Sequence, residues 1–344
     1  MMSEHNVVLG FADDKTFTVT VGENENLADA AKRQGHNLEI GCEFGVCGTC
    51  KAHCVEGEYE MEDFDPSALT IFDQKRNYVL VCVMHPKSDC RVNFTYDSSK
   101  AGAEDLTKDL ACTVSSIDMV SDTVARVALT LPEGESFDFD PGQYVNLTIP
   151  GAEHFRSYSF ANPPFEKDEI VFYIRLLPQG LMSDYLRGDA KVGDVMSVAG
   201  PHGQFYLREV RRPIMMIGGG TGLAPMLSML DQMIEQGTTD QPITLLYGAN
   251  NYEELFAIDK LEAYKTQFKQ FSYDIALVNE HAEWSGTVGF VTHLLNDGQL
   301  NGGDLDVYLC GPPPMIDSST EWLVKHGVDE DQSIHAEKFT ASVS

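Results

Sequence analysis

The chain has 344 residues, 43% of them hydrophobic, which suits two or three domains that each have a core. Its 53 acidic and 24 basic residues give a net charge of −29, which argues against nucleic acid as a partner because phosphates would be repelled. No apolar run approaches the ~20 residues of a membrane span, and the polar start MMSEHNVV lacks the features of a secretory signal, so we expect a soluble cytoplasmic protein without a membrane segment.

Residues 1–98 predict a first, small domain. Strand-like runs over 7–11 and 16–21 flank a turn and indicate a hairpin. The stretch NLADAAKRQG predicts a helix that begins after Asn26 and ends before Gly35. Two further strand-like runs, over 78–83 and 91–96, close this domain.

The stretch GCEFGVCGTC, residues 41–50, follows the predicted helix. The spacing C-x4-C-x2-C, followed after 31 residues by a fourth cysteine, is formed by Cys42, Cys47, Cys50 and Cys82. This spacing is typical of plant-type [2Fe–2S] sites, in which four thiolates hold two irons. Glycines let the backbone wrap closely around a cluster, and we expect bulky side chains at Gly45 and Gly48 to crowd it.

Other interpretations of the cysteines stay open. Structural zinc sites favour paired CxxC motifs, and this chain has one such motif. A [4Fe–4S] cluster would enlist Cys54, but the C-x2-C-x2-C-x3-C-P run is absent. A disulfide framework is disfavoured without an export signal, and Cys54, Cys90 and Cys112 are interpreted as ordinary thiols. Residues 56–65 carry six acids and no base and are a candidate docking surface.

The middle of the chain predicts a linker over 99–109 and an antiparallel barrel over 110–209, because short strands there alternate with turns. Within it, RSYSF holds an arginine that can pair with a pyrophosphate and a tyrosine that can stack on a flat heterocycle. RSYSF also fits an ordinary barrel strand. Gly180 and Ser183 mark a helix start whose free amides suit a phosphate.

From 210 to 344, strands alternate with helices, which predicts a parallel sheet with helices on its faces. A strand over 214–217 ends in GGGTG before a helix near Pro225, and such a turn lets a dinucleotide phosphate approach the backbone. The absence of GKS or GKT argues against P-loop chemistry. The stretch CGPPPM, residues 310–315, ends another strand at the edge where open sheets bind ligands.

Together these motifs resemble the reductase components of bacterial multicomponent oxygenases. The resemblance rests on CEFGVCGTC with Cys82, PGQYVNLTIPG, RSYSFANPP, GGGTGLAP, YLCGPPPMID and the closing EKF. It implies a plant-type ferredoxin domain of the β-grasp fold, a flavin-binding β-barrel and a parallel α/β nucleotide-binding domain like that of ferredoxin reductases. The motifs RSYSFANPP, LYGANNYEELFAIDKLE and YLCGPPPMID favour a resemblance to reductases of soluble diiron monooxygenases. Reductases of Rieske ring-hydroxylating dioxygenases share the same domain order and much of the same motif set.

The resemblance also implies roles for particular residues. The expected ligands of the [2Fe–2S] cluster are Cys42, Cys47, Cys50 and Cys82. The expected FAD-binding residues are Arg156 at the pyrophosphate, Ser157, Tyr158 on the isoalloxazine, Ser159 near its N5, Gly180, Met182 and Ser183. The expected nucleotide-binding residues are Gly219, Gly220, Thr221, Cys310 and Gly311. Phe339 is expected to cover the flavin and Glu337 to lie close to the site of hydride transfer.

The resemblance implies a monomer that takes hydride from NADH onto FAD and passes single electrons through the cluster to a diiron hydroxylase. NADH is favoured over NADPH because carboxylates, and no arginine, follow the relevant strands, at Glu253, Glu254 and Glu280. The alternatives are the reductase of a Rieske dioxygenase, a free-standing NADH-dependent flavoprotein, and a zinc-stapled module fused to a nucleotide sensor.

Overall fold

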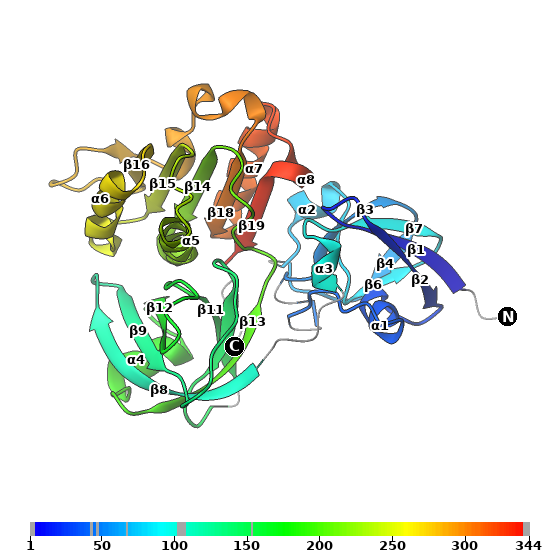
Figure 1. Cartoon of the computed structure of the whole chain (residues 1–344), viewed down its shortest axis with the longest axis horizontal. Helices are drawn as coiled ribbons and strands as arrows, with labels where there is room; N and C mark the ends of the chain where they lie inside the picture. Colours follow the sequence, from blue (N-terminus) through cyan, green and yellow to red (C-terminus); the bar gives the residue numbers. More distant parts are fainter. Residues whose placement is uncertain are drawn as a thin grey trace. The chain divides into compact units, whose positions relative to one another are not determined.

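The computed structural model describes residues 4–41, 44–45, 48–66, 68–101, 108–152 and 154–339. Within these ranges, no helix is both long and apolar enough to cross a membrane. The chain divides into two compact units, Met1–Leu106 with His202–Gln204, and Thr107–Pro201 with Phe205–Ser344 (Figure 1).

The first unit is a small mixed domain. Its strands are β1 (Glu4–Gly10), β2 (Thr16–Gly22), β3 (Lys51–Glu56), β4 (Tyr59–Met61), β5 (Tyr78–Leu80), β6 (Met84–Pro86) and β7 (Cys90–Asn93). Its helices are α1 (Leu27–Arg33), α2 (Ile71–Lys75) and α3 (Ser98–Ala101). The main sheet has the order β2-β1-β7-β3-β5, with β1 antiparallel to β2 and parallel to β7. The predicted β-grasp domain, its first hairpin and its first helix are confirmed.

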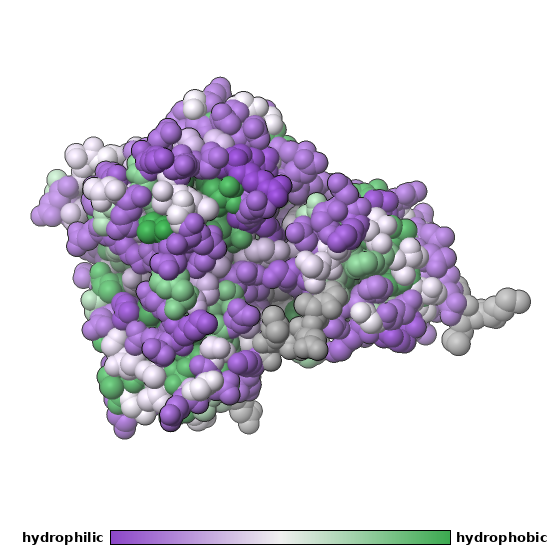
Figure 2. Space-filling view, viewed as in Figure 1, coloured by the Kyte–Doolittle hydropathy of each residue, from purple (hydrophilic) through white to green (hydrophobic). Residues whose placement is uncertain are grey.

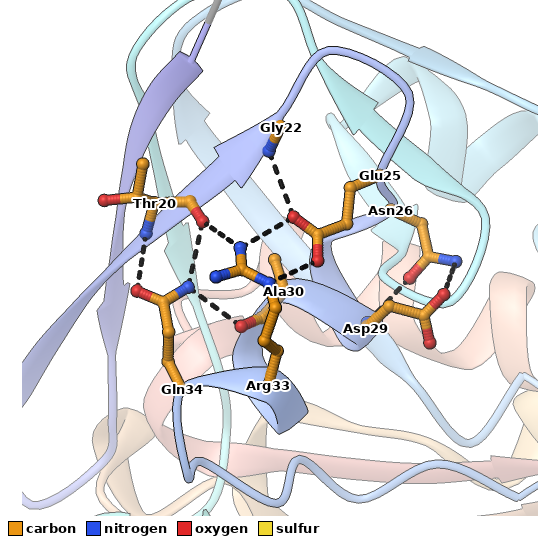
Figure 3. Close-up of polar contacts among 8 residues, drawn as sticks. All are labelled: Thr20, Gly22, Glu25, Asn26, Asp29, Ala30, Arg33 and Gln34. Carbon is orange, nitrogen blue, oxygen red and sulfur yellow. Dashed lines mark hydrogen bonds and ion pairs between the residues drawn. The ribbon is translucent and has the colours of Figure 1, made fainter.

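A polar network fastens α1 to β2 (Figure 3). Asn26 caps the helix by accepting a hydrogen bond from the amide of Asp29 at 2.8 Å. Arg33 donates to both carboxylate oxygens of Glu25, each at 2.8 Å, and to the carbonyl oxygen of Thr20 at 2.9 Å. The bond from Arg33 holds the pKa of Glu25 below its ordinary value. This network fixes the helix that leads into the cysteine-rich stretch.

The first part of the second unit is an antiparallel barrel. Its strands are β8 (Lys108–Met119), β9 (Val124–Thr130), β10 (Tyr144–Thr148), β11 (Phe155–Ser159), β12 (Glu169–Arg175) and β13 (Val195–His202), and its helix is α4 (Leu181–Gly188). The sheet order is β11-β10-β13-β8-β9-β12. Residues just after β11 bond to β12 and close the sheet, since Ala161 N donates to Val171 O at 2.8 Å. The predicted barrel is confirmed.

The rest of the second unit is built around a six-stranded parallel sheet of order β17-β16-β15-β14-β18-β19. Its strands are β14 (Ile214–Gly219), β15 (Ile243–Ala249), β16 (Phe271–Leu277), β17 (Thr287–Val288), β18 (Asp306–Gly311) and β19 (Ile334–Lys338). Its α-helices are α5 (Leu223–Glu235), α6 (Ile258–Gln267), α7 (Pro313–Lys325) and α8 (Glu330–Ser333). Its 3-10 helices are η1 (Gly220–Gly222), η2 (Tyr252–Glu254), η3 (Val291–Leu294), η4 (Asp297–Gln299) and η5 (Asn301–Gly303). Helices α5 and α6 cover one face of the sheet and α7 covers the other, as predicted (Figure 1).

Some element boundaries differ from the sequence expectations. The strand expected over 78–83 ends at Leu80, because Lys51 and Leu80 form the last pair of the ladder and β3 begins at Lys51. Cys82 therefore lies in a turn rather than on a strand. The longest barrel strand, β8, was not anticipated as a strand, and it includes the last two residues of the expected linker. At the other end of that segment α3 extends to Ala101, and residues 102–107 lie outside the described part of the chain.

Candidate cofactor-binding sites

Two of the four expected cluster ligands lie side by side in the first unit. The Sγ atoms of Cys50 and Cys82 are 3.2 Å apart, and both residues are buried. Cys42 and Cys47 lie outside the described residues. Backbone bonds fix the turn that carries Cys82, because Val81 donates to Cys50 O at 3.2 Å and accepts from Ala28 N on α1 at 3.2 Å. Paired thiols on a braced turn fit the ligand set of an iron–sulfur cluster.

The glycines of the cysteine-rich stretch are needed for their backbone and for close packing. Gly45 and Gly48 have φ values of +68° and +77°, in the left-handed region that favours glycine. A Cβ at Gly45 would lie 2.8 Å from Cβ of Phe64, and a Cβ at Gly48 would lie 3.1 Å from the carbonyl oxygen of Ala68. A side chain at either glycine would therefore crowd neighbouring protein atoms, whether or not a cluster is bound.

The other described cysteines of this part of the chain form a second pair that the sequence did not reveal. Cys54 on β3 and Cys90 on β7 are both buried, and their thiols donate to Glu56 O at 3.4 Å and to Ser88 O at 3.3 Å. Each thiol acts on the other, and their interaction raises the pKa of Cys54 and lowers the pKa of Cys90. Cys112 lies in the barrel core, and burial raises its pKa to about 12. These thiols are separate from the Cys50–Cys82 pair.

Strand β11 presents the residues expected at the flavin. Ser159 is buried, and no described group lies within hydrogen-bond distance of its Oγ. Tyr158 packs against the barrel core, and burial raises its pKa above the ordinary value. Arg156 is half-buried and donates to Phe155 O at 2.8 Å, and Ser157 is exposed and donates from Oγ to Oδ1 of Asn146 at 2.7 Å. A buried hydroxyl without a hydrogen-bond partner, on the residue that follows a tyrosine, fits a ligand with a ring nitrogen that can bond to it.

Helix α4 carries the residues that are expected at a phosphate. Gly180 is its N-cap, and the first-turn amides have no acceptor within the helix. Ser183 is buried and accepts a hydrogen bond from Leu177 N at 2.9 Å. Met182 contributes its side chain to the barrel core, so only its backbone is available to a ligand. Arg187, which the sequence did not single out, braces the same loop by donating to Leu177 O at 2.6 Å.

The glycine turn after β14 packs tightly against the end of β18. A Cβ at Gly222 would lie 2.1 Å from the carbonyl oxygen of Cys310, and a Cβ at Gly219 would lie 2.6 Å from Sδ of Met315. Gly220 and Thr221 belong to η1, immediately before α5. Neighbouring strand ends and a helix start thus share the carboxyl edge of the sheet, which is the geometry that dinucleotide sites use.

Strand β19 brings the last two expected residues to this edge. Glu337 pairs with Cys310 in the ladder between β18 and β19, and Phe339 N donates to Gly311 O at 2.8 Å. Cys310 is fully buried, and burial, reinforced by the charge of Glu337, raises its pKa far above the ordinary value. Cys310 is therefore a protonated thiol at neutral pH. The stretch EKF is implied only by the family resemblance, because nothing local in the sequence joins it to β18.

The end of β11 and the glycine turn after β14 lie close together inside the second unit. Ala161, two residues after Ser159, packs with Ala224, two residues after Gly222. Ser228 on α5 also donates to Asn162 O at 2.8 Å. The structure therefore brings the end of β11 and the start of α5 together, as transfer of a hydride between two bound cofactors requires.

The carboxylates expected to discriminate against NADPH differ in their surroundings. Glu254 is buried and accepts hydrogen bonds from Arg175 at 3.1 Å and from Asn251 at 3.0 Å, so its charge is already used inside the protein. Glu253 lies 3.1 Å from Nε2 of His281. Glu280 is exposed just after β16. Of the three carboxylates, Glu280 is the one best placed to meet a nucleotide.

Three family models match the chain. A 2Fe-2S iron-sulfur cluster binding domain matches residues 11–87, an oxidoreductase FAD-binding domain matches 111–206, and an oxidoreductase NAD-binding domain matches 216–321. The three matches follow the order in which the sites described above occur along the chain.

Similar proteins match over almost the whole length. The chain is 42% identical to the anthranilate 1,2-dioxygenase electron transfer component of Acinetobacter baylyi, with 98% of both chains covered. It is 36% identical to the propane 2-monooxygenase reductase component of Mycolicibacterium goodii, with 94% of both covered. Among solved structures, the Amycolatopsis cytochrome P450 reductase GcoB gives a TM-score of 0.72 at 26% identity, covering 97% of this chain and 99% of that one.

Proposed function

This chain belongs to the family of reductase and electron transfer components of oxygenases, and we propose that it carries electrons from NADH through FAD and a [2Fe–2S] cluster to an oxygenase component. The observation that carries the proposal is the junction between β11 and α5. There the residues expected at the flavin and the turn expected at the nucleotide are joined by the Ala161–Ala224 packing.

When bound, FAD accepts a hydride from NADH and releases the electrons singly, and the [2Fe–2S] cluster carries one electron at a time. The protein holds these groups and sets their surroundings. Arg156 and the first-turn amides of α4 would bind the pyrophosphate of FAD. The ring of Tyr158 would stack on the isoalloxazine. The buried hydroxyl of Ser159 would form its missing hydrogen bond with a ring nitrogen.

The carboxyl edge of the parallel sheet would orient the nicotinamide. Gly219, Gly220 and Thr221 would let the dinucleotide approach the backbone. Cys310, a protonated thiol, would act there as a small uncharged contact rather than as a nucleophile. Phe339 would shield the transfer site from water.

The experiment is anaerobic addition of NADH to the purified holoprotein, followed by visible absorption and low-temperature EPR. We expect bleaching of the flavin and the rhombic signal of a reduced [2Fe–2S] cluster. Bleaching without that signal, from protein that contains its full complement of iron, would exclude the proposed route. Zinc in place of iron would point to the zinc-stapled alternative.

Two classes of oxygenase component are candidates for the partner. The diiron hydroxylase predicted from the motifs is supported by the similarity to propane 2-monooxygenase reductase, at 36% identity. A dioxygenase component is favoured by the 42% identity to the anthranilate 1,2-dioxygenase electron transfer component. Reconstitution with one oxygenase of each class, scored as hydroxylated product formed per NADH consumed, decides between them. A free-standing flavoprotein would couple to neither.

We further infer that the protein is a cytoplasmic monomer and that it prefers NADH to NADPH, with Glu280 repelling a 2′-phosphate. The preference is tested by comparing kcat/KM for the two nucleotides in the wild-type protein and in Glu280→Ser. Light scattering of the holoprotein tests whether it is a monomer.

The docking surface is inferred to be the acidic stretch 56–65 together with the part of the cysteine-rich stretch around 43–46, where Phe44 is 74% exposed.

A further inference from the structure

A buried carboxylate joins the barrel to the parallel-sheet part of the second unit. Glu254 is 8% exposed, and its Oε1 accepts hydrogen bonds from Nη2 of Arg175 at 3.1 Å and from Nδ2 of Asn251 at 3.0 Å. Its Oε2 accepts from the amide of Asn250 at 3.3 Å. Arg175 is the last residue of β12, while the other three residues follow β15. One cation and two amides therefore satisfy a charge that would be costly to bury unpaired.

These bonds continue toward the nucleotide edge. Asn279 follows β16, the strand next to β15, and donates from Nδ2 to Oδ1 of Asn251 at 2.8 Å. Its amide also donates to Asn250 O at 2.9 Å. Because the carboxyl ends of neighbouring parallel strands are where open sheets bind dinucleotides, these asparagines lie beside the expected ribose end of NADH. A continuous hydrogen-bonded path thus runs from β12 to Asn279, next to Glu280.

Uncharged contacts support the same junction. Asp122 N, in the turn between β8 and β9, donates to Glu253 O at 3.2 Å. The rings of Tyr173 on β12 and Phe256 lie 4.7 Å apart between centroids. The loop over 250–256 is therefore held along its length against the barrel, and the Arg175–Glu254 pair is its charged contact.

We propose that Arg175 and Glu254 are positioning residues for the nucleotide, which rests on the proposed use of NADH. The pair holds the loop over 250–254, and through it Asn279, in register with the barrel that binds FAD. Loosening the loop weakens binding of NADH at its ribose end. The pair lies on the barrel side of the loop and does not contact the nucleotide, so it does not itself distinguish NADH from NADPH.

The test compares Arg175→Met, Glu254→Gln and the double variant with wild-type holoprotein by anaerobic stopped-flow reduction of the flavin over a range of NADH concentrations. We expect each single variant to raise the Kd for NADH about tenfold, an ordinary size for coupling between linked sites, with a far smaller change in the limiting rate. The Kd of the double variant is expected to be no higher than the higher of the two single-variant Kd values, because the two residues act as one pair. Arg175→Lys is expected to restore part of the affinity.

The control is Arg126→Met. Arg126 lies on the neighbouring strand β9, opposite Tyr173, with 32% of its side chain exposed against 37% for Arg175. Its carboxylate partners, Asp118 and Glu169, are 3.9 Å and 3.8 Å away, both in the barrel. This variant is expected to keep the wild-type Kd. NADPH is measured with every variant, and the ratio of kcat/KM for the two nucleotides is expected to stay constant.

An unchanged Kd in both single variants overturns the proposal, and so does strict additivity in the double variant. The proposal is also overturned if the variants lose FAD while the molecules that retain FAD bind NADH with the wild-type Kd. The pair would then serve folding alone. A selective gain with NADPH in Glu254→Gln would make Glu254 a direct contact and overturn the positioning role. Failure of NADH to reduce the wild-type flavin would instead refute the proposed function, before any variant is compared.

Discussion

The hydroxyl of Ser159 is buried, and the described structure gives it no hydrogen-bond partner. Leaving such a group unsatisfied costs about 1–3 kcal/mol, so native proteins rarely keep one without a reason. A ring nitrogen of FAD would supply the missing bond. The neighbouring Ser157 is different, because its exposed hydroxyl already donates to Asn146.

Ser159→Ala is therefore expected to slow reduction of the flavin by NADH about 10- to 100-fold, since a bond to an atom whose charge changes during transfer is lost. Anaerobic stopped-flow absorption measures this rate. Ser157→Ala is the matched control and is expected to stay near the wild-type rate. Equal rates in the two variants would contradict the role of Ser159.

Gly45→Ala is expected to lower the iron content of the purified protein, because the new Cβ would lie 2.8 Å from Cβ of Phe64 and would shift the cysteine-rich stretch. Gly35→Ala is the control. Gly35 also has a positive φ, +85°, but a Cβ there would meet nothing within 4 Å. Both variants carry a backbone strain of about 1–2 kcal/mol. Iron analysis and the EPR signal should separate them, and similar losses in both would mean that backbone strain alone is responsible.

At the scale of elements, β19 is joined to α7 by an ion pair formed by two residues from the motifs YLCGPPPMID and EKF. Nζ of Lys338 lies 2.8 Å from Oδ1 of Asp317, with side-chain exposures of 9% and 23%. Lys338 lies between Glu337 and Phe339 on the strand that borders Cys310. The pair therefore fixes the end of β19 that faces the expected transfer site.

Asp317→Asn is expected to lower the free energy of unfolding by about 1.5–3 kcal/mol and to slow flavin reduction, because the mostly buried ammonium of Lys338 loses its charge-assisted bond to Asp317. Lys260→Met is the control, since Lys260 pairs with Asp231 at 2.6 Å between α6 and α5, away from β19. Denaturant unfolding and stopped-flow reduction measure the two effects. If Lys260→Met slows flavin reduction as much as Asp317→Asn does, the effect reflects general stability and not the position of β19.

For the whole molecule, the net charge of −29 affects which partner surfaces the protein can approach readily. Figure 2 shows hydrophilic residues over most of the visible face, with apolar residues in scattered groups. In the first unit the described acids Glu56, Glu58, Glu60, Glu62 and Asp63 are exposed. Such a surface fits a partner with basic residues around its docking site, which would speed the encounter of the two proteins.

Raising the salt concentration from 0.01 M to 0.5 M is expected to slow electron delivery to the oxygenase component about tenfold or more, because the Debye length falls well below the size of the interface. Reduction of a small uncharged acceptor by NADH is expected to change little. Steady-state rates with both acceptors measure the difference. A rate to the oxygenase that does not depend on salt would exclude electrostatic docking.

Local sequence patterns by themselves predicted the cysteine spacing, the strands that end in glycine turns and the alternation of strands and helices. Each of these depends on neighbouring residues and on the chemistry of the group they bind. The tertiary structure alone decided that Cys82 lies in a turn, that Cys54 meets Cys90, and that Glu254 is neutralised by Arg175, 79 residues away. Such contacts depend on strand order and register, which bring distant residues together and which no local pattern records.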